Sequence, residues 1–338
     1  MKQTVENEET LLKVENLRKW FPVRKGFFET FFSRKQMFVR AVDGINFEIM
    51  RREVVGLVGE SGSGKTTTGR LLLKLIDPTS GKIYFDNKDI TSLPANELIP
   101  LRRRMQIIFQ DPYESLNPRM TVADIVAEPL RVQKALSDPA DIDKRVKETI
   151  AAVELLPPEE FLFRFPHELS GGQRQRVSIA RAFVLRPEFL VADEPVSMLD
   201  VSIRAGILNM MLDLVEKFNT SFLYITHDLA LARHICDRII IMYLGKIMEM
   251  GSTENIVYEP LHPYTKALIS TVPVPDPTIK RSEVVIPGEI PSPINPPSGC
   301  RFHTRCPFYI GEICRTQEPE LFEIKSGHSV ACHLYPKK

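Results

Sequence analysis

A glycine-rich loop between an apolar stretch and a helical stretch constrains this chain more than any other feature. The segment Gly59-Glu60-Ser61-Gly62-Ser63-Gly64-Lys65-Thr66-Thr67 matches the pattern G-x-x-x-x-G-K-[ST]; the apolar run 54–58 precedes it and the helical run 70–76 follows it. Glycines let the backbone turn tightly enough for several N–H groups to face one anion, and the next helix adds its positive N-terminus. A tight turn without a ligand is the alternative, but a Lys-Thr pair at this offset favours a phosphate-binding loop.

Two side chains of this loop carry its expected chemistry. Lys65 can reach the terminal phosphates of a nucleotide, and the Thr66 hydroxyl can ligate Mg²⁺. The sequence therefore predicts a nucleoside triphosphate site. The loop residues predicted to bind the nucleotide are Gly59, Ser61, Gly62, Ser63, Gly64, Lys65, Thr66 and Thr67.

A second glycine-rich turn, Leu169-Ser170-Gly171-Gly172-Gln173, opens the helical run 174–185. Taken alone, Ser170 is best interpreted as the capping residue of that helix. The acidic segment that follows it changes this interpretation, because it supplies further parts of a nucleotide-hydrolysing site.

That segment is an apolar, strand-like run, 189–195, which contains Asp193 and Glu194 near its end. Ligands bind at the carboxyl ends of the strands in an open parallel sheet, so both acids are expected beside the phosphate-binding loop. Asp193 suits the Mg²⁺ shell, and Glu194 suits the polarisation of an attacking water.

Two further apolar runs are expected to deliver polar side chains to the same edge. The run 221–228 contains His227, and Gln110 follows the run 105–109. Each residue taken singly is more often a structural hydrogen-bonding group. Because both residues are expected at the same sheet edge, His227 is predicted to contact the γ-phosphate. The amide oxygen of Gln110 is predicted to bind Mg²⁺ or water. The predicted catalytic set is Glu194, His227 and Gln110, and the predicted Mg²⁺ set is Thr66, Gln110 and Asp193.

In this order the motifs resemble those of the nucleotide-binding subunit of an ABC transporter, over roughly residues 11–271. The resemblance implies an ATP sandwich of two chains. One chain holds the phosphates through its Lys65 and Thr66, and the partner closes the site with its second glycine-rich turn. The residues of that turn predicted to bind nucleotide are Ser170, Gly171, Gly172 and Gln173.

The resemblance also assigns roles to single residues. Glu194 is the expected general base, His227 contacts the γ-phosphate, and Asp200 belongs to the loop that links the two sites. Phe21 is the expected aromatic on adenine, with Phe38 as the alternative. The segment Ser197-Met198-Leu199-Asp200 has Met where the family usually has Ala, and both side chains are apolar.

A narrower resemblance is to the ATPases of dipeptide and oligopeptide importers. Three segments are typical of them: the long extension 109–120 after Gln110, the insertion 24–40, and the run 261–268 with the cysteine-bearing tail beyond it. This implies import of di- or oligopeptides by an assembly with two permease subunits, an extracytoplasmic substrate-binding protein and a second, related ATPase chain. The chain is then expected at the cytoplasmic face of the membrane, bound through the permeases.

The tail carries chemistry of its own, because Cys300, Cys306, Cys314 and Cys332 are spaced C-x5-C-x7-C-x17-C. The polar start of the chain shows no secretory signal, so a metal or free thiols are expected rather than disulfides. Four thiolates suit a [4Fe–4S] cluster or zinc, and the absence of tight C-x2–4-C pairs favours the cluster. The resembled subfamily includes members with such a cluster in this region. Zinc and reduced thiols remain alternatives.

Composition limits the function classes further. The formal net charge of +1 gives no electrostatic footprint for nucleic acid, and no apolar stretch has the ~20 residues of a membrane helix. A phenylalanine-rich insertion, 26–38, could lie against a membrane or a permease, or could pack on the protein itself. The competing class, a soluble ABC ATPase acting on DNA or ribosomes, would be expected to carry a coiled-coil insertion, zinc inserts or two nucleotide domains.

The expected fold is α/β: a P-loop ABC ATPase core with a helical subdomain and an antiparallel β subdomain, plus a small cysteine-containing C-terminal extension. The predicted boundaries are 11–271 for the nucleotide-binding domain, with the helical subdomain at about 112–186, then a proline-rich linker at 272–297 and the extension at 298–338. The cargo stays open, because importers of oligosaccharides and nickel use similar ATPases.

Overall fold

The computed structural model describes residues 9–23, 36–271 and 285–336, and within them the chain forms two structural units. One unit is built mainly from Ser92–Ile225, and the other from Leu12–Glu48, Val55–Thr91 and Thr226–Lys338. Three predicted features lie partly outside the described residues: the phenylalanine-rich insertion 26–38 up to residue 35, the segment 24–40 up to residue 35, and the predicted linker 272–297 up to residue 284.

The first unit combines parallel strands with a group of helices. Strand β7 pairs in parallel with β6 on one side and with β8 on the other, and every residue of β7 and β8 is buried. Such continuous apolar runs are typical of parallel strands that are covered on both faces. The strands are β6 Met105–Ile108, β7 Phe189–Asp193 and β8 Ser221–Thr226. The helices are α2 Ala95–Arg104, α3 Pro112–Ser115, α4 Val122–Val132, α5 Pro139–Ala152, α6 Glu159–Leu162, α7 Gly171–Phe183 and α8 Val201–Phe218, with a 3-10 turn at Pro166–Glu168.

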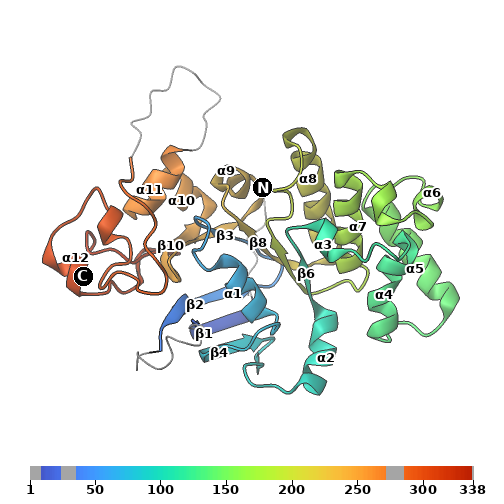
Figure 1. Cartoon of the computed structure of the whole chain (residues 1–338), viewed down its shortest axis with the longest axis horizontal. Helices are drawn as coiled ribbons and strands as arrows, with labels where there is room; N and C mark the ends of the chain where they lie inside the picture. The colour runs from blue at the N-terminus through green and yellow to red at the C-terminus, as the bar shows by residue number, and fades with distance from the viewer. Residues whose placement is uncertain (1–8, 24–35, 272–284, 337–338) are drawn as a thin grey trace, which may run out of the picture. The chain divides into compact units, whose positions relative to one another are not determined.

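In this unit α4 to α7 form the helical group (Figure 1), where α4 packs against both α5 and α7. The buried residues Ile125, Val126 and Leu130 of α4 recur at the spacing of one helical face. The predicted helical character of the segment after Pro112 is therefore confirmed.

The second unit contains an antiparallel sheet of β2, β1, β4 and β5 in that order. Leu12 and Val14 of β1 are buried and stand opposite Phe85 and Ile83 of β4, which gives the alternation expected of a sheet with one buried face. These strands are β1 Thr10–Pro22, β2 Phe38–Met50, β4 Ser80–Phe85 and β5 Lys88–Asp89.

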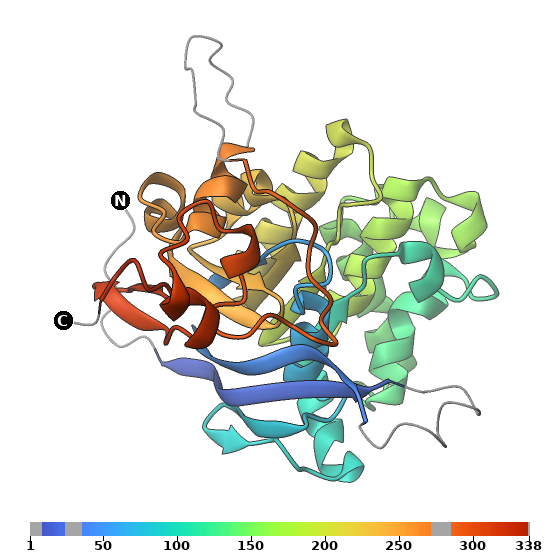
Figure 2. The same cartoon turned by 60° about the vertical axis from the view of Figure 1, so that its left-hand side comes forward.

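The same unit contains a second set of strands, in which the end of the chain extends the sheet. Strand β3 pairs in parallel with β9, β9 forms an antiparallel hairpin with β10, and β12 of the C-terminal hairpin pairs with β10. Figure 2 shows that C-terminal hairpin in red beside the orange strand β10. These strands are β3 Val54–Val58, β9 Arg238–Tyr243, β10 Lys246–Ser252, β11 Phe322–Lys325 and β12 His328–Val330. The helices are α1 Lys65–Leu72, α9 Leu229–Ile235, α10 Thr253–Tyr258, α11 Pro263–Ser270 and α12 Glu312–Thr316, with a 3-10 turn at His303–Arg305.

The helix after the phosphate-binding loop differs from the prediction. It begins at Lys65 rather than at residue 70, and it ends at Leu72 rather than at residue 76. Lys74 adopts a left-handed backbone conformation (φ 51°), which ends the helix early. None of the helices in the described ranges is long and apolar enough to cross a membrane.

Candidate nucleotide-binding site

The phosphate-binding loop follows β3 directly and is held against neighbouring backbone. A Cβ added at Gly59 would lie 2.2 Å from the carbonyl oxygen of Met242, and one at Gly64 would lie 2.1 Å from that of Ala41. Gly64 also has a φ of 105°, which side chains rarely adopt. Both positions therefore require glycine, as the sequence pattern predicts.

Lys65 is the buried cation of this loop, with 5% of its surface exposed. Its Nζ donates to the carbonyl oxygens of Gly59 at 2.7 Å and Glu60 at 2.9 Å. Because α1 begins at Lys65, the ammonium group and the N-terminal N–H groups of the helix occupy the same short segment. This combination of donors suits a phosphate group.

The second glycine-rich turn opens α7 with a reciprocal cap. The Ser170 hydroxyl accepts from the Gln173 N–H at 3.3 Å, and the Gln173 side chain accepts from the Ser170 N–H at 3.0 Å. Ser170 is exposed, Gly171 is half-buried, and a Cβ at Gly172 would meet Ile203 of α8 at 3.3 Å. The predicted cap is therefore present, and it presents the serine at the surface of this unit.

Parallel strand ends in the same unit bring two predicted residues together. Gln110 follows β6 and Glu194 follows β7, and the Gln110 Nε2 donates to Glu194 Oε2 at 3.1 Å. Asp193, the last residue of β7, is buried. Glu194 has a φ of 46°, a left-handed conformation that costs energy for a side chain of this size and is typical of functional sites.

Of the other predicted residues, His227 comes directly after β8 and is exposed, and Asp200 is exposed at the start of α8. Phe21 lies on β1 with 38% of its surface exposed, as a stacking platform requires, and the Lys19 Nζ lies 5.0 Å from its ring centre. Phe38 instead lies half-buried, with its ring centre 6.3 Å from that of Trp20.

The four tail cysteines lie in one region of the second unit. The Cys300 N–H donates to the Cys314 carbonyl at 2.9 Å; Cys300, Cys314 and Cys332 are buried and Cys306 is half-buried. Burial is the main cause that raises the pKa of the Cys300 thiol to about 12 and that of Cys332 to about 11, and neighbouring cysteines contribute to both increases. Across the described part of the chain, no three His, Cys, Asp or Glu side chains are grouped closely enough to hold one metal ion.

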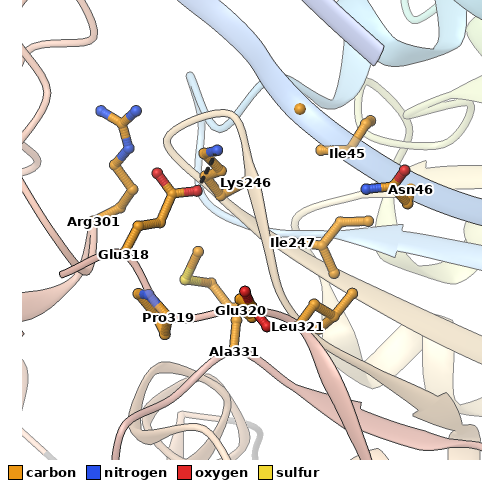
Figure 3. Close-up of a pocket in the computed structure, with 12 residues that line it drawn as sticks. Ile45, Asn46, Lys246, Ile247, Arg301, Glu318, Pro319, Glu320, Leu321 and Ala331 are labelled. Carbon is orange, nitrogen blue, oxygen red and sulfur yellow. Dashed lines mark ion pairs between the residues drawn. The ribbon is translucent and has the colours of Figure 1, made fainter. Parts of the chain in front are cut away.

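A cavity of about 430 Å³ lies elsewhere in the second unit, between β2, β10 and the C-terminal segment. Lys246 and Glu318, which line this cavity, form an ion pair at 2.5 Å. Figure 3 shows this pair as a dashed line, with Arg301 beside it. Its lining contains none of the residues predicted to bind nucleotide or metal.

Two family models match the chain. Residues 42–197, which include the phosphate-binding loop, the capped turn and the acidic strand end, match the ABC transporter family. Residues 248–314 match the C-terminal region of oligopeptide/dipeptide transporters.

Curated relatives extend these matches to nearly the whole chain. The oligopeptide transport ATP-binding protein AppF of Bacillus subtilis is 48% identical over 335 residues, which cover 98% of this chain and 99% of AppF. A putative peptide import ATP-binding protein of Brucella ovis is 48% identical over 325 residues, with 96% and 98% covered. The chain belongs to the ABC transporter family, in the branch of oligopeptide and dipeptide ATP-binding subunits. The resemblance predicted from the motifs is confirmed.

Solved ABC structures confirm the predicted fold class. The ATP-binding cassette MJ0796, solved as a dimer in a post-hydrolysis state with ADP and Pi, is 30% identical with a TM-score of 0.61, covering 72% of this ABC subunit and 99% of that cassette. Clostridium perfringens cbiO1, described as part of the ABC transporter complex cbiONQ, is 28% identical with a TM-score of 0.62, covering 75% and 92%.

Proposed function

We propose that this ABC subunit hydrolyses ATP to power the import of di- or oligopeptides. The observation that carries the proposal is the joint presence, in one chain, of the phosphate-binding loop, the capped glycine-rich turn, the Gln110–Glu194 pair and the C-terminal region of oligopeptide transporters. The relatives named for peptide import cover almost the full chain, which supports the same cargo class here.

The nucleotide binds at the loop 59–67, where the Lys65 ammonium and the N-terminus of α1 offer the positive charge that phosphates require. Phe21 offers an exposed ring for the base. Oxygen donors of Thr66, Gln110 and Asp193 suit Mg²⁺, which neutralises phosphate charge when it is bound. Glu194, oriented by Gln110, takes the proton of the attacking water, and His227 contacts the γ-phosphate.

The active species is a pair of ATPase chains. This chain carries one set of nucleotide motifs, and the exposed Ser170 on α7 supplies the turn 170–173 that closes over the phosphates of the other chain. The dimeric form in which MJ0796 was solved supports this arrangement. The second chain is a related but different ATPase, as the resemblance implies.

The extension after Gln110 provides the surface for the permeases. Helix α3 is tied to α7 because Arg181 donates to the Ser115 carbonyl at 2.6 Å and Arg174 lies 4.1 Å from the ring centre of Tyr113. Tyr113 keeps 65% of its surface exposed. A rigidly held, exposed aromatic side chain suits a protein interface, so this segment docks the chain to two permeases at the cytoplasmic face of the membrane. The extracytoplasmic binding protein delivers peptide to those permeases.

We further propose that the four tail cysteines would hold a [4Fe–4S] cluster. Cys300, Cys306, Cys314 and Cys332 offer four sulfur donors in one region, three of them buried and one half-buried, and four cysteine sulfurs are the donor set of such a cluster. One zinc ion needs its sulfurs at about 2.3 Å from a single point, whereas a cluster of four irons spaces its cysteines further apart. When bound, the cluster would supply a redox-active, charged centre to this region.

The ATPase proposal is tested with two variants of this chain, each assembled with the second ATPase chain and the permeases. Glu194→Gln should lower ATP turnover at least about 100-fold while ATP binding is retained, because it removes the base and leaves the phosphate loop intact. Lys65→Ala should weaken ATP binding itself. Turnover that survives both substitutions would refute these roles.

The cluster proposal is tested by absorption spectra and by iron, sulfide and zinc analysis of protein purified without oxygen. We expect broad visible absorption that bleaches with dithionite, with about four irons per chain. Colourless protein with one zinc, or with neither metal, would refute the cluster and leave the ATPase proposal standing.

A further inference from the structure

The C-terminal part of the chain contacts the phosphate-binding loop at Glu60. Glu60, the second residue of the loop, accepts two hydrogen bonds from Arg305: Nη1 to Oε2 at 2.8 Å and Nη2 to Oε1 at 3.4 Å. The Glu60 backbone N–H donates to the Tyr264 hydroxyl at 2.9 Å. Both the side chain and the backbone of this loop residue are therefore fixed by residues more than 200 positions later.

Burial strengthens the ion pair between Arg305 and Glu60. The Arg305 side chain is 9% exposed and that of Glu60 is 25% exposed, so water competes weakly for the pair. Two parallel N–H···O contacts also fix the plane of the carboxylate, which a single contact would not do.

An aromatic cluster anchors the segment that carries Arg305. Phe302, three residues earlier, is fully buried; its ring centre lies 5.3 Å from that of Tyr243 at an angle of 88°, and 5.3 Å from that of Tyr264. Tyr243 also contacts the arginine, with its hydroxyl 3.3 Å from Nη1. These packing contacts therefore hold Arg305 in the position from which it pairs with Glu60.

Glu60 connects this anchor to the phosphate-binding lysine. Its carbonyl oxygen is one of the two backbone acceptors of the Lys65 Nζ. A shift of the Glu60 backbone would move that acceptor and change the shape of the cradle formed by the following N–H groups. The geometry of the loop thus depends on a residue that immediately precedes Cys306.

A second buried arginine connects the same turn to the strand that carries Phe21. Arg301, beside Cys300, donates to Asp43 at 2.5 Å, and Asp43 accepts from the Trp20 Nε1 at 3.0 Å. Arg301 and Asp43 are almost fully buried. The turn between Cys300 and Cys306 therefore contacts the phosphate loop directly, through Glu60, and is linked through Asp43 to Trp20, the neighbour of Phe21.

We propose that Arg305 is a positioning residue for nucleotide binding, through which the cysteine-bearing C-terminal region sets the affinity of the phosphate loop for ATP. The inference rests on the proposed function, since it assumes that ATP binds at this loop. Coupling between two regions acts in both directions, so nucleotide binding also stabilises the folded C-terminal region.

The test is a double-mutant cycle on the full-length chain, with Arg305→Gln, Glu60→Gln and the combined variant. The readout is the dissociation constant of a fluorescent ATP analogue, measured beside the melting temperature without nucleotide. Arg315→Gln is the matched control, because Arg315 lies beside Cys314 but pairs with Glu312 at the surface, 60% exposed.

We expect each single variant to bind the analogue about five-fold more weakly or worse, and the combined variant to bind no worse than the weaker single one, because both changes break one contact. Arg315→Gln should bind like the wild type. Arg305→Lys, which keeps the charge but not the paired contacts, should lie between wild type and Arg305→Gln. It serves as the second variant if Arg305→Gln does not fold.

Unchanged affinity in Arg305→Gln and Arg305→Lys, or losses from Arg305→Gln and Glu60→Gln that simply add, would overturn the inference. Weaker binding that only follows a lower melting temperature, and that Arg315→Gln shares, would do the same. Failure of the wild type to bind the analogue is a different outcome, because it would overturn the proposed ATPase function itself.

Discussion

Glu249 offers a sharp quantitative test of how the C-terminal region joins the ATPase core. This carboxylate lies on β10 and has no exposed surface. It accepts the backbone N–H groups of Leu261 and His262, each at 2.8 Å, and its Oε1 lies 2.7 Å from the Nε2 of His328 on β12. One side chain therefore ties β10 to the start of α11 and to the C-terminal hairpin.

The substitution Glu249→Gln keeps the size and removes half of this acceptor capacity. The amide oxygen can replace Oε1, which serves Leu261 and His328, but the amide NH₂ must then face the His262 N–H. The variant loses one charge-assisted hydrogen bond and leaves a buried donor unsatisfied, a cost of about 3 kcal/mol. Because the unfolding entropy grows with chain length, the melting temperature of this chain should fall by about 4 °C.

The assay is thermal unfolding followed by circular dichroism, with Glu259→Gln as the matched control. Glu259 and Lys325 also form an ion pair involving the C-terminal hairpin, but both side chains are 56% exposed, so water and salt weaken it. The control should change the melting temperature little. Equal shifts for the two variants would refute the argument that burial makes Glu249 important.

Two further predictions concern the loop and α11. Gly59→Ala should abolish ATP binding in an equilibrium binding assay, because the new Cβ would lie 2.2 Å from the Met242 carbonyl; Gly206→Ala on α8, which meets nothing within 4 Å, should bind normally and be slightly stabilised. Burial lowers the pKa of His262 from 6.5 to about 4. As the pH falls, the unfolded chain therefore binds a proton at this histidine before the folded chain does. The free energy of unfolding should fall by about 3 kcal/mol between pH 6.5 and pH 4. His262→Asn, which can still cap α11, should flatten that fall in urea titrations across this pH range, and an unchanged slope would contradict the assignment.

The sequence predicted the parts of the site that depend on local pattern. Glycines 59 and 64 had to be glycine for reasons that the loop motif contains, and the Ser170 cap follows from residues three apart. The contact between Gln110 and Glu194 was also predictable. Gln110 follows β6 and Glu194 follows β7, and these two strands pair in parallel, so their carboxyl ends lie side by side.

Long-range partners lay beyond the sequence. Arg305 and Glu60 are 245 positions apart, and Arg301 and Asp43 are 258 apart, so no periodic pattern connects them. The arginines beside Cys300 and Cys306 were visible signals, but an arginine in a cysteine-rich tail is usually exposed. The early start of α1 was missed because Thr66, Thr67 and Thr68 are weak helix formers, and the loop geometry overrides that preference.

The sequence showed that the tail contains four cysteines, but their spacing did not predict how they are arranged in space. The structure shows that they lie in one region and that three of them are buried, because the chain folds back between Cys300 and Cys332. The fold-back depends on the antiparallel pairing of β12 with β10, which holds the end of the chain against the sheet that contains β10. Because this pairing is long-range, the sequence pattern could not predict it.

The most direct measurement of the central claim is uptake of a labelled tripeptide into vesicles that contain this chain with its permeases, its second ATPase and its binding protein. We predict uptake that requires ATP and is lost when this chain carries Glu194→Gln. Peptide uptake that continues at the wild-type rate with that variant, or without ATP, would contradict the account.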